Sequence, residues 1–412
     1  MSNPDVVVIG AGAAGVGAGI ELRERGIDCL ILDGANRVGG RAFTDTRSLP
    51  RAWDHGCHWF HSADVNPLVP WADRLGTTYA REVWGDAMMI WTEGVWEGRE
   101  AIDEAEDALD AVYDAVEAAA GDPAMSEVMP DGGRWARGIR CVIQQLHSVD
   151  PEQISCIGSN DYSDTDVNWP VLSGYGDLIA RMAHGLPVRL ECPVTGVAET
   201  AAGVRVETAS GPIDAKSAIV TASTNVLRSG AIAIGPGPAR DLLDLIETVP
   251  CGSYEKVAVA LKTPLVDDAD KRFCEINPGP SGPVVDFQIV PGDVPIMIAH
   301  LAGGMVRALD AEARTAIVLE RLEMAFGSRT RDQILATATT GWETNPLIRG
   351  AYSCSVPGSG RKRHEMIAAD TGRIAFAGEA FSLKWQATAH GAYQSGRDVA
   401  SRIAHMLGGS TQ

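Results

Sequence analysis

A glycine-rich turn near the start of the chain has the residue types and spacing that bind a dinucleotide. Gly10, Gly12, Ala14 and Gly15 follow a short apolar run, and Asp33 ends the next one. Glycines at these places let backbone N–H groups approach a pyrophosphate closely, and the N-terminus of the following helix favours its negative charge. A carboxylate at Asp33 can accept hydrogen bonds from ribose hydroxyls, which favours FAD or NAD over NADP. The pattern alone does not choose between FAD and NAD.

The elements that must position this turn are readable in the flanking sequence. Residues 5–9 and 29–32 are apolar runs of strand character, and a weakly patterned helix is predicted between them. Strand, tight turn, helix, strand and terminal acid in this order predict a dinucleotide site in an α/β fold. The plainer alternative is a glycine-rich turn in an α/β domain that binds nothing.

Patterns farther along the chain predict more strands and helices. Short β-like runs occur at residues 188–190, 194–197, 204–206, 218–221, 256–261, 295–298 and 374–378. Helices are predicted at residues 102–120, 311–326 and about 391–407. Carboxylates cover the outer side of the first of these helices, which indicates a solvated surface and not a site.

Composition limits the classes of function. The chain has 412 residues, 45% of them hydrophobic, and a formal net charge of −19. This length suggests two or three structural domains, and the acidic balance argues against attraction to nucleic acid or anionic lipid. Eight scattered cysteines without zinc spacing predict reduced thiols and a cytoplasmic location. We expect no signal peptide and no membrane span, because a strand begins at residue 5 and no long apolar run exists.

Five separated stretches carry residues suited to a flavin site. The first is the glycine-rich turn together with Arg37-Val-Gly39-Gly40-Arg41, which follows Asp33. The others are Asp54–His61 running into Asn66-Pro-Leu, then Gly252–Lys256, Trp342–Ser353 and Phe376–Gly396. The last of them reads as a strand, a glycine turn and a loop that leads into a helix N-terminus. Such a helix end can stabilise negative charge on a ring.

Together these stretches resemble the flavin-containing amine oxidases, especially the branch of polyamine oxidases and histone-lysine demethylases. The Arg-x-Gly-Gly-Arg pattern is similar to that family's second FAD fingerprint, so the resemblance selects FAD over NAD. It implies an α/β fold in which a Rossmann-like FAD-binding domain of the glutathione-reductase type is interleaved with an α+β substrate domain. The FAD-binding domain would comprise residues 1–75, 170–250 and 340–412, and the substrate domain residues 76–169 and 251–339.

The same resemblance implies which residues surround FAD. Arg41 would contact the pyrophosphate, Glu379 the ribityl or pyrophosphate region, and the backbone of Val194 the adenine. Trp342 would pack against the flavin or the cavity. The remaining cofactor-binding candidates belong to the same motifs: Gly10, Gly12, Ala14, Gly15, Asp33, Gly34, Arg37, Gly39, Gly40, Gly56, Cys57, His58, Trp59, Gly378, Ala387, Thr388 and Ala389.

Three residues are catalytic candidates by this resemblance. Lys256 would hold a water near flavin N5, and burial beside an apolar ring would disfavour its ammonium form. Tyr352 would form one wall of an aromatic passage, and it joins His61 and Trp385 as a candidate for substrate binding. Thr388 stands where monoamine oxidases have a second tyrosine, so the cage is half open. The plainer interpretations are an exposed strand lysine for Lys256 and a core tryptophan for Trp385.

Two further expectations concern what the site lacks. Monoamine oxidases bind flavin through a cysteine just before the first tyrosine, whereas this chain has Ala351 there and Cys354 out of register. We therefore predict non-covalent FAD. His55, His58 and His61 are evenly spaced but lie in a predicted loop, so we predict no metal site.

The implied activity is FAD-dependent oxidation of an amine to an imine, with O2 reduced to hydrogen peroxide. Water would hydrolyse the imine to an aldehyde or a keto acid. The substrate is open among polyamines, secondary amines and primary amines, and no carboxylate cluster can be placed in the cavity from the sequence. The alternatives are an L-amino-acid oxidase, a desaturase or protoporphyrinogen-oxidase-like enzyme acting on carbon skeletons, and a flavin-holding scaffold. The expected partners are a small-molecule amine and O2, without nucleic acid or membrane, and the chain could form a homodimer.

Overall fold

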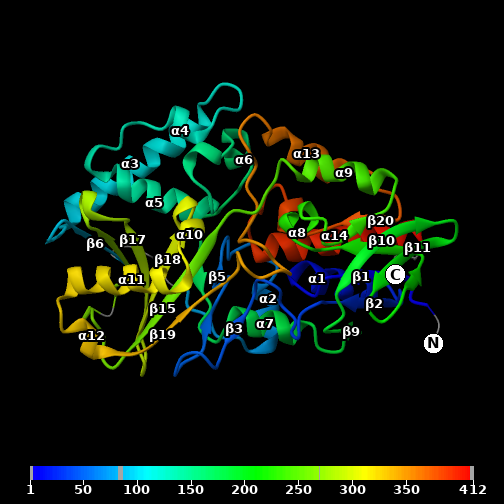
Figure 1. Ribbon diagram of the computed structural model, residues 1–412, viewed down its shortest axis with the longest axis horizontal. Coiled ribbons are helices and arrows are strands. Elements are labelled where there is room, and N and C mark those ends of the chain that lie inside the picture. The colour runs from blue at the N-terminus through cyan, green and yellow to red at the C-terminus, as the bar shows by residue number, and fades with distance from the viewer. Residues whose placement is uncertain (1–2, 82–86, 269, 409–412) are drawn as a thin grey trace.

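Two β-sheets of different construction organise the chain (Figure 1). The structure is a computed structural model that describes residues 3–81, 87–268 and 270–408. A five-stranded sheet lies on the right of Figure 1, and a seven-stranded sheet lies on the left. Among the described residues, no helix is long and apolar enough to cross a membrane.

The five-stranded sheet is parallel throughout and takes its strands from distant parts of the chain. Its order is β20 (Ile374–Phe376), β13 (Ser217–Val220), β1 (Val6–Ile9), β2 (Cys29–Leu32) and β9 (Val188–Arg189). Its central strands are almost wholly buried, as expected for a parallel sheet covered on both faces. The unit predicted around the glycine-rich turn is confirmed, because α1 (Ala13–Glu24) connects β1 to β2.

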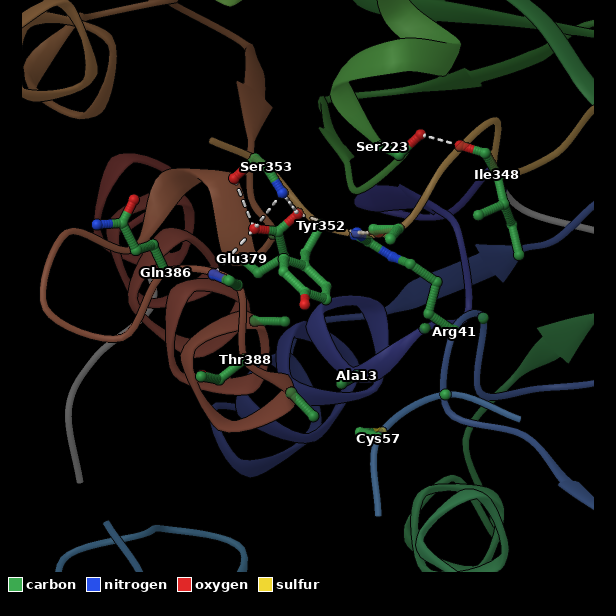
Figure 2. Close-up of a pocket in the computed structure, with 18 of the residues that line it drawn as sticks. Ala13, Arg41, Cys57, Ser223, Ile348, Tyr352, Ser353, Glu379, Gln386 and Thr388 are labelled. Carbon is green, nitrogen blue, oxygen red and sulfur yellow. Dashed lines mark hydrogen bonds and ion pairs between the residues drawn. The ribbon is translucent and has the colours of Figure 1, made fainter. Parts of the chain in front are cut away.

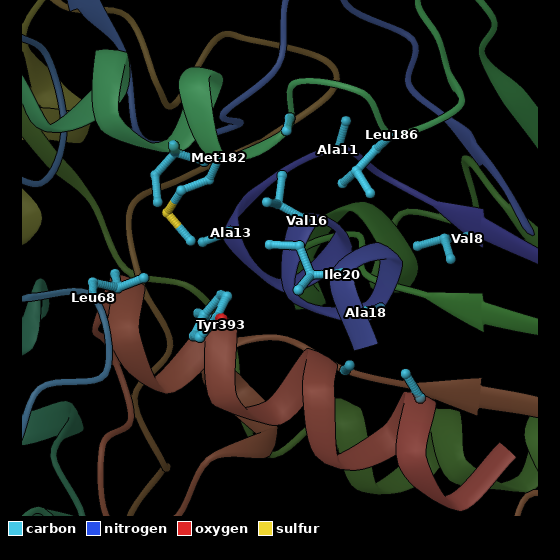
Figure 3. Close-up of a cluster of buried hydrophobic side chains, with 14 of the residues drawn as sticks. Val8, Ala11, Ala13, Val16, Ala18, Ile20, Leu68, Met182, Leu186 and Tyr393 are labelled. Atoms are coloured by element: carbon cyan, nitrogen blue, oxygen red, sulfur yellow. The ribbon is translucent and has the colours of Figure 1, made fainter. Parts of the chain in front are cut away.

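Alternate residues of these strands enter two different hydrophobic cores. Val6 and Val8 pack with α1, α7 (Tyr175–Met182) and α14 (Ala389–Met406), a cluster that Figure 3 shows from the side of α1 and α14. Val7 and Ile9 face a second layer on the opposite side of the sheet. That layer consists of β12 (Ile213–Ala215), β11 (Gly203–Thr208), β10 (Val194–Thr200), β14 (Ala233–Ile234), α8 (Thr224–Arg228), α9 (Pro238–Ile246) and α13 (Gly360–Ala368).

The seven-stranded sheet is mostly antiparallel and also has two distinct faces. Its order is β19 (Ile334–Thr339), β15 (Tyr254–Leu261), β18 (Ile296–Ala302), β17 (Val285–Val290), β16 (Phe273–Asn277), β6 (Met88–Thr92) and β7 (Val95–Trp96). Val257, Val285 and Ala299 point to a core that includes α11 (Ala311–Phe326). Because side chains alternate along a strand, Lys256, Asp286 and their neighbours point to the opposite face. This second face is the one that takes part in the site described below.

A helical layer covers part of that second face. It contains α3 (Arg99–Glu117), α4 (Met125–Val128), α5 (Ala136–His147) and α6 (Cys156–Asn160), which lie at the upper left of Figure 1. The remaining helices are α2 (Val69–Leu75), α10 (Gly304–Ala308), α12 (Thr330–Gln333) and the short 3-10 helices Gly133–Trp135, Pro151–Gln153, Gly279–Ser281 and Glu379–Phe381. Two small sheets pair β3 (Thr44–Asp45) with β4 (Trp53–Asp54) and β5 (Trp59–Phe60) with β8 (Trp169–Pro170).

The α/β fold predicted from the sequence is confirmed. The helix expected at residues 311–326 has these same bounds, and α3 buries Ile102, Val112 and Val116 while its carboxylate-bearing side stays outward. The numerical domain boundaries remain a prediction, although strands from three separate segments do meet in the five-stranded sheet.

Helices α1 and α14 approach each other through glycines. A Cβ atom at Gly17 would lie 2.3 Å from the carbonyl oxygen of Tyr393, and one at Gly396 would lie 2.0 Å from that of Ala14. Both distances are far below van der Waals contact, so these positions admit no side chain unless a helix moves. The contact therefore fixes how closely α14 lies against the turn at the start of α1.

Gly396→Ala should destabilise the protein by about 1–3 kcal/mol, because overpacking outweighs the better helix propensity of alanine. Urea unfolding of both proteins measures the difference. Asp398→Ala, at an exposed position of the same helix, is the control and should change stability by less than about 0.5 kcal/mol. If the Gly396→Ala variant were as stable as the parent, α1 and α14 would be able to move apart without a cost in stability.

Candidate active site

A cavity of about 1360 Å³ extends from the glycine-rich turn to the second face of the seven-stranded sheet. Gly12 and Asp33 line it at the parallel sheet, and Lys256 and His300 line it at the other sheet. Figure 2 shows part of the lining, with Ala13 of α1, Arg41 and Glu379 around the same space. Residues far apart in the sequence therefore share one enclosure.

Two of the three glycines of the turn are required by the packing of the protein, and the third leaves space for a ligand. A Cβ at Gly10 would lie 2.3 Å from Thr221 Oγ1, and one at Gly15 would lie 1.9 Å from the carbonyl oxygen of Gly10. Both glycines are thus required by the packing of the protein itself. A Cβ at Gly12 would meet no atom closer than 3.9 Å, and Gly12 has an ordinary extended backbone at the N-cap of α1. The space beside Gly12 is therefore open to a ligand at a helix N-terminus, where anions bind.

The Asp33 carboxylate is held in place at the edge of the cavity. Its Oδ2 accepts a hydrogen bond of 2.7 Å from the backbone N–H of Ala11, and its Oδ1 accepts one of 2.8 Å from Ala35. These bonds leave lone pairs free, because each carboxylate has about four acceptor sites. Asp33 is thereby oriented to accept from hydroxyl groups in the cavity.

A buried carboxylate, Glu379, joins three segments of the chain beside the cavity (Figure 2). Glu379 accepts from Arg41 Nη1 at 3.0 Å, from the Ser353 hydroxyl at 2.7 Å and from the backbone N–H of Ala387 at 3.1 Å. The same Ser353 hydroxyl accepts from the fully buried Arg363 at 3.1 Å. Burial raises the pKa of the Glu379 carboxyl, but Arg41, Ser353 and Arg363 outweigh it and lower that pKa below its usual value. Glu379 is therefore ionised, and Arg41 presents a fixed guanidinium at the cavity wall.

Lys256 is buried, and its ammonium group is surrounded by acceptors. Its Nζ lies 3.2 Å from the carbonyl oxygen of Asp54, 2.6 Å from that of Gly56 and 2.9 Å from His58 Nδ1. Burial lowers the pKa of Lys256 to about 8, although Asp54 and Cys57 act in the opposite direction. The predicted role of holding a water stays a prediction, and such a water would have to replace one of these three acceptors.

Two imidazoles lie against each other near Lys256. The rings of His58 and His300 are nearly parallel, with centroids 5.7 Å apart, and His300 Nδ1 lies 2.6 Å from the Tyr254 hydroxyl. Burial and the neighbouring Lys256 lower the pKa of both histidines well below its usual value. Both rings are therefore neutral near pH 7, so they supply hydrogen-bonding atoms and no charge.

The predicted cage residues have partners that limit what they can do. The Tyr352 hydroxyl donates to the carbonyl oxygen of Gln145, and its ring lies 5.9 Å from that of Tyr254. The Thr388 hydroxyl donates to the carbonyl oxygen of Trp385 and accepts from the N–H of Gly391, so it caps α14. Tyr352 and Thr388 both line the cavity, and Tyr254 forms a second aromatic wall beside Tyr352.

Most of the residues predicted for the site line this one cavity. Three of them do not: Gly15 lies behind the turn, Arg37 stacks on the Phe43 ring at 4.1 Å, and Trp385 packs against His390. The predicted residues that do line it are Gly10, Gly12, Ala14, Asp33, Gly34, Gly39, Gly40, Arg41, Gly56, Cys57, His58, Trp59, His61, Val194, Lys256, Trp342, Tyr352, Gly378, Glu379, Ala387, Thr388 and Ala389.

The cavity also contains polar residues that the sequence did not indicate as a group. Asp114, Glu117, Asp164 and Asp166 are exposed where they line it, and Asp286 lies deeper, on the sheet. The carboxylates come from α3, the segment before β8, and β17, so no local motif could reveal them. The three evenly spaced histidines have separate partners, since His55 bonds Asp45, His58 contacts Lys256 and His61 bonds Asn168.

Two features show that the cavity fits FAD. The open space beside Gly12 allows a pyrophosphate to reach the N-terminus of α1. His390, on the first turn of α14, is fully buried and lines the cavity, and its Nε2 has no hydrogen-bond partner among the described residues. A buried polar atom without a partner is costly, which points to a missing polar ligand.

This fold and cavity define a Rossmann-like dinucleotide-binding protein whose nucleotide site continues into a second, sheet-lined chamber. Residues 8–75 match the family model of the NAD(P)-binding Rossmann-like domain, and residues 145–404 match that of the flavin containing amine oxidoreductases. The chain belongs to the flavin containing amine oxidoreductases, and its cofactor is FAD.

Curated relatives and solved structures agree with this assignment. The chain is 25% identical to human lysine-specific histone demethylase 2, over 98% of this chain and 53% of the relative. It is also 25% identical to polyamine oxidase 4 of Oryza sativa subsp. japonica, over 96% of this chain and 87% of the relative. The chain thus spans about half the length of the demethylase.

The solved structures show the likeness in fold. Cyclohexylamine oxidase from Brevibacterium oxydans superposes with a TM-score of 0.82 at 18% identity, covering 99% of this chain and 100% of that one. A redesigned putrescine oxidase gives a TM-score of 0.80 at 18% identity, covering 98% and 99%.

Gly12→Val should fold but fail to retain FAD, because the new side chain would occupy the open space at the helix N-terminus. The ratio of flavin absorbance to protein absorbance after purification measures this loss. Gly98→Val is the matched control, since Gly98 is also an extended N-cap glycine with no atom within 4 Å. If the Gly12→Val protein retained as much flavin as the control, the pyrophosphate could not bind beside Gly12.

Proposed function

We propose that this chain oxidises a small-molecule amine to an imine, with FAD as cofactor and O2 as the final electron acceptor, which yields hydrogen peroxide. The observation that carries the proposal is the continuity of the cavity between the glycine-rich turn and the polar face of the seven-stranded sheet. FAD, when bound, supplies the acceptor for the hydrogen lost from the carbon next to nitrogen. The protein supplies binding, orientation and exclusion of water.

The residues that would hold FAD belong to the parallel sheet and its loops. Gly12 would admit the pyrophosphate, Asp33 would accept from ribose hydroxyls, and Arg41 would balance phosphate charge. We propose that FAD is bound non-covalently, because Ala351 stands at the expected attachment place. The two nearby thiols that line the cavity are unreactive, since burial raises the pKa of Cys57 and of Cys354 to about 12.

The residues at the far end of the cavity would position the amine. Tyr254 and Tyr352 form adjacent aromatic walls, and the neutral His58 and His300 offer acceptor and donor atoms without adding positive charge. Lys256 would act from its fixed position beside His58. No residue need remove a proton if the reacting amine enters in its neutral form.

The charge of the lining supports a cationic substrate class. Four exposed carboxylates and Asp286 line the cavity. Of its cationic residues, Arg41 is paired with Glu379, Lys256 is enclosed by acceptors, and Arg349 is exposed, so carboxylates outnumber the cations. Such a field attracts amines and disfavours the carboxylate of an amino acid. We also propose a cytoplasmic location, because all eight cysteines are free thiols.

A peroxide-coupled screen over monoamines, diamines, polyamines and amino acids should give peroxide with at least one amine and none with amino acids. The control is Gly12→Val protein, which should give no peroxide with any of these compounds. Peroxide formed only with amino acids would contradict the proposed substrate class, and peroxide from none of the compounds would contradict the activity.

Lys256→Met should slow flavin reduction by the amine, or its reoxidation by O2, by about tenfold or more, because a fixed polar group would be lost beside the reacting centre. Stopped-flow absorbance of the flavin separates the two steps. Lys262→Met removes an exposed lysine just beyond the end of the same strand and should leave both rates unchanged. Unchanged rates in a folded Lys256→Met protein would remove Lys256 from the mechanism.

A further inference from the structure

Four ionisable residues stand in one row across the seven-stranded sheet. Lys256 pairs with His300 across β15 and β18, His300 pairs with Asp286 across β18 and β17, and Asp286 pairs with Glu275 across β17 and β16. Directly paired residues point to the same face of a sheet. The row therefore leads from Lys256, whose Nζ contacts residues 54–58, to a pair of carboxyl groups two and three strands away.

Neither carboxyl group of this row has a counter-charge, and of the two it is Asp286 that borders the cavity. Its Oδ1 is shielded from solvent and has no hydrogen-bond partner among the described residues. An unpaired carboxylate oxygen in an enclosed site costs several kcal/mol unless something pairs with it. Asp286 Oδ1 therefore needs a hydrogen-bond donor or a cation from within the cavity.

The groups that face Asp286 do not supply that cation. They are Glu275 on β16, His300 on β18, Tyr254 on β15, and Cys141 with Gln145 on α5. His300 is neutral, as shown above, and Lys256 is bound to Asp54, Gly56 and His58. No side chain among these neighbours brings a positive charge, so the cation must come with the ligand.

We propose that Asp286 binds the second, non-reacting ammonium group of a diamine or polyamine substrate. This inference rests on the proposed function, because it places the reacting amine at the Lys256 end of the row. Adjacent strands lie about 4.8 Å apart, so the backbones at Lys256 and Asp286 are separated by about 10 Å. A substrate whose two nitrogens are joined by a chain of several carbons spans such a distance.

The burial of Asp286 makes this subsite sensitive to pH. Burial raises the pKa of Asp286 to about 7, and burial together with Asp286 raises the pKa of Glu275 to about 8. Below the pKa of Asp286 the carboxyl is protonated and loses its attraction for an ammonium group. The preference for a diamine over a monoamine should therefore rise as pH increases through about 7.

The test compares kcat/KM for 1,5-diaminopentane and 1-aminopentane in holoenzyme carrying Asp286→Asn. We expect kcat/KM for the diamine to fall about 30-fold or more, mainly through KM, and that for the monoamine to change less than about threefold. Asp107→Asn removes one negative charge from an exposed position of α3 and is the control for the general field. It should change neither value.

The outcomes separate this subsite from the activity itself. Equal loss with both amines, or no loss with either, would overturn the subsite while leaving amine oxidation intact. If Asp286→Asn does not fold, the ratio of diamine to monoamine kcat/KM in the parent protein decides, because a ratio independent of pH between about 6 and 8 overturns the subsite. If neither amine is oxidised, the peroxide-coupled screen decides the proposed function, and the subsite then requires that the diamine raise the Tm of the holoenzyme more than the monoamine does.

Discussion

The ion pair between Glu379 and Arg41 is the interaction on which the cavity depends. Glu379 follows β20, Arg41 lies in the loop after β2, and Ser353 and Ala387 belong to two further loops that bind the same carboxylate. A buried charge keeps its ionised form only when partners surround it, so these loops are held together by the cost of leaving Glu379 unpaired. The loops that would surround FAD are thereby fixed before any ligand enters.

The two sheets make different contributions around that fixed centre. The parallel sheet offers backbone N–H groups and a helix N-terminus, which suit the phosphates of FAD. The antiparallel sheet offers a row of side chains, since its register brings Lys256, His300 and Asp286 side by side. The neutral imidazole of His300 separates the lysine from the carboxylate, so the positive and the negative group stay at different places in the cavity and can orient an amine.

The parts of this site that were predictable from the sequence are those encoded by neighbouring residues. The β1–α1–β2 unit and Asp33 follow from the glycine spacing, while Lys256 and Glu379 follow from motifs that resemble a known family. The polar row was not predictable, because its members are single ionisable residues in apolar strands that meet only through long-range pairing. Strands β16 and β17 were missed for the same reason, since Glu275 and Asp286 interrupt their apolar pattern. Trp385 was predicted for substrate binding but packs beside His390, because no motif specifies which way an isolated tryptophan faces.

We propose that one enclosure brings the flavin of bound FAD against an amine. Anaerobic mixing of the purified holoenzyme with an excess of diamine tests it most directly, with the absorbance of oxidised flavin as the measurement. We expect the yellow colour to be lost without O2 and to return when air is admitted, with peroxide formed. Flavin that stays oxidised in the presence of every amine, while chemical or photochemical reduction remains effective, would contradict it.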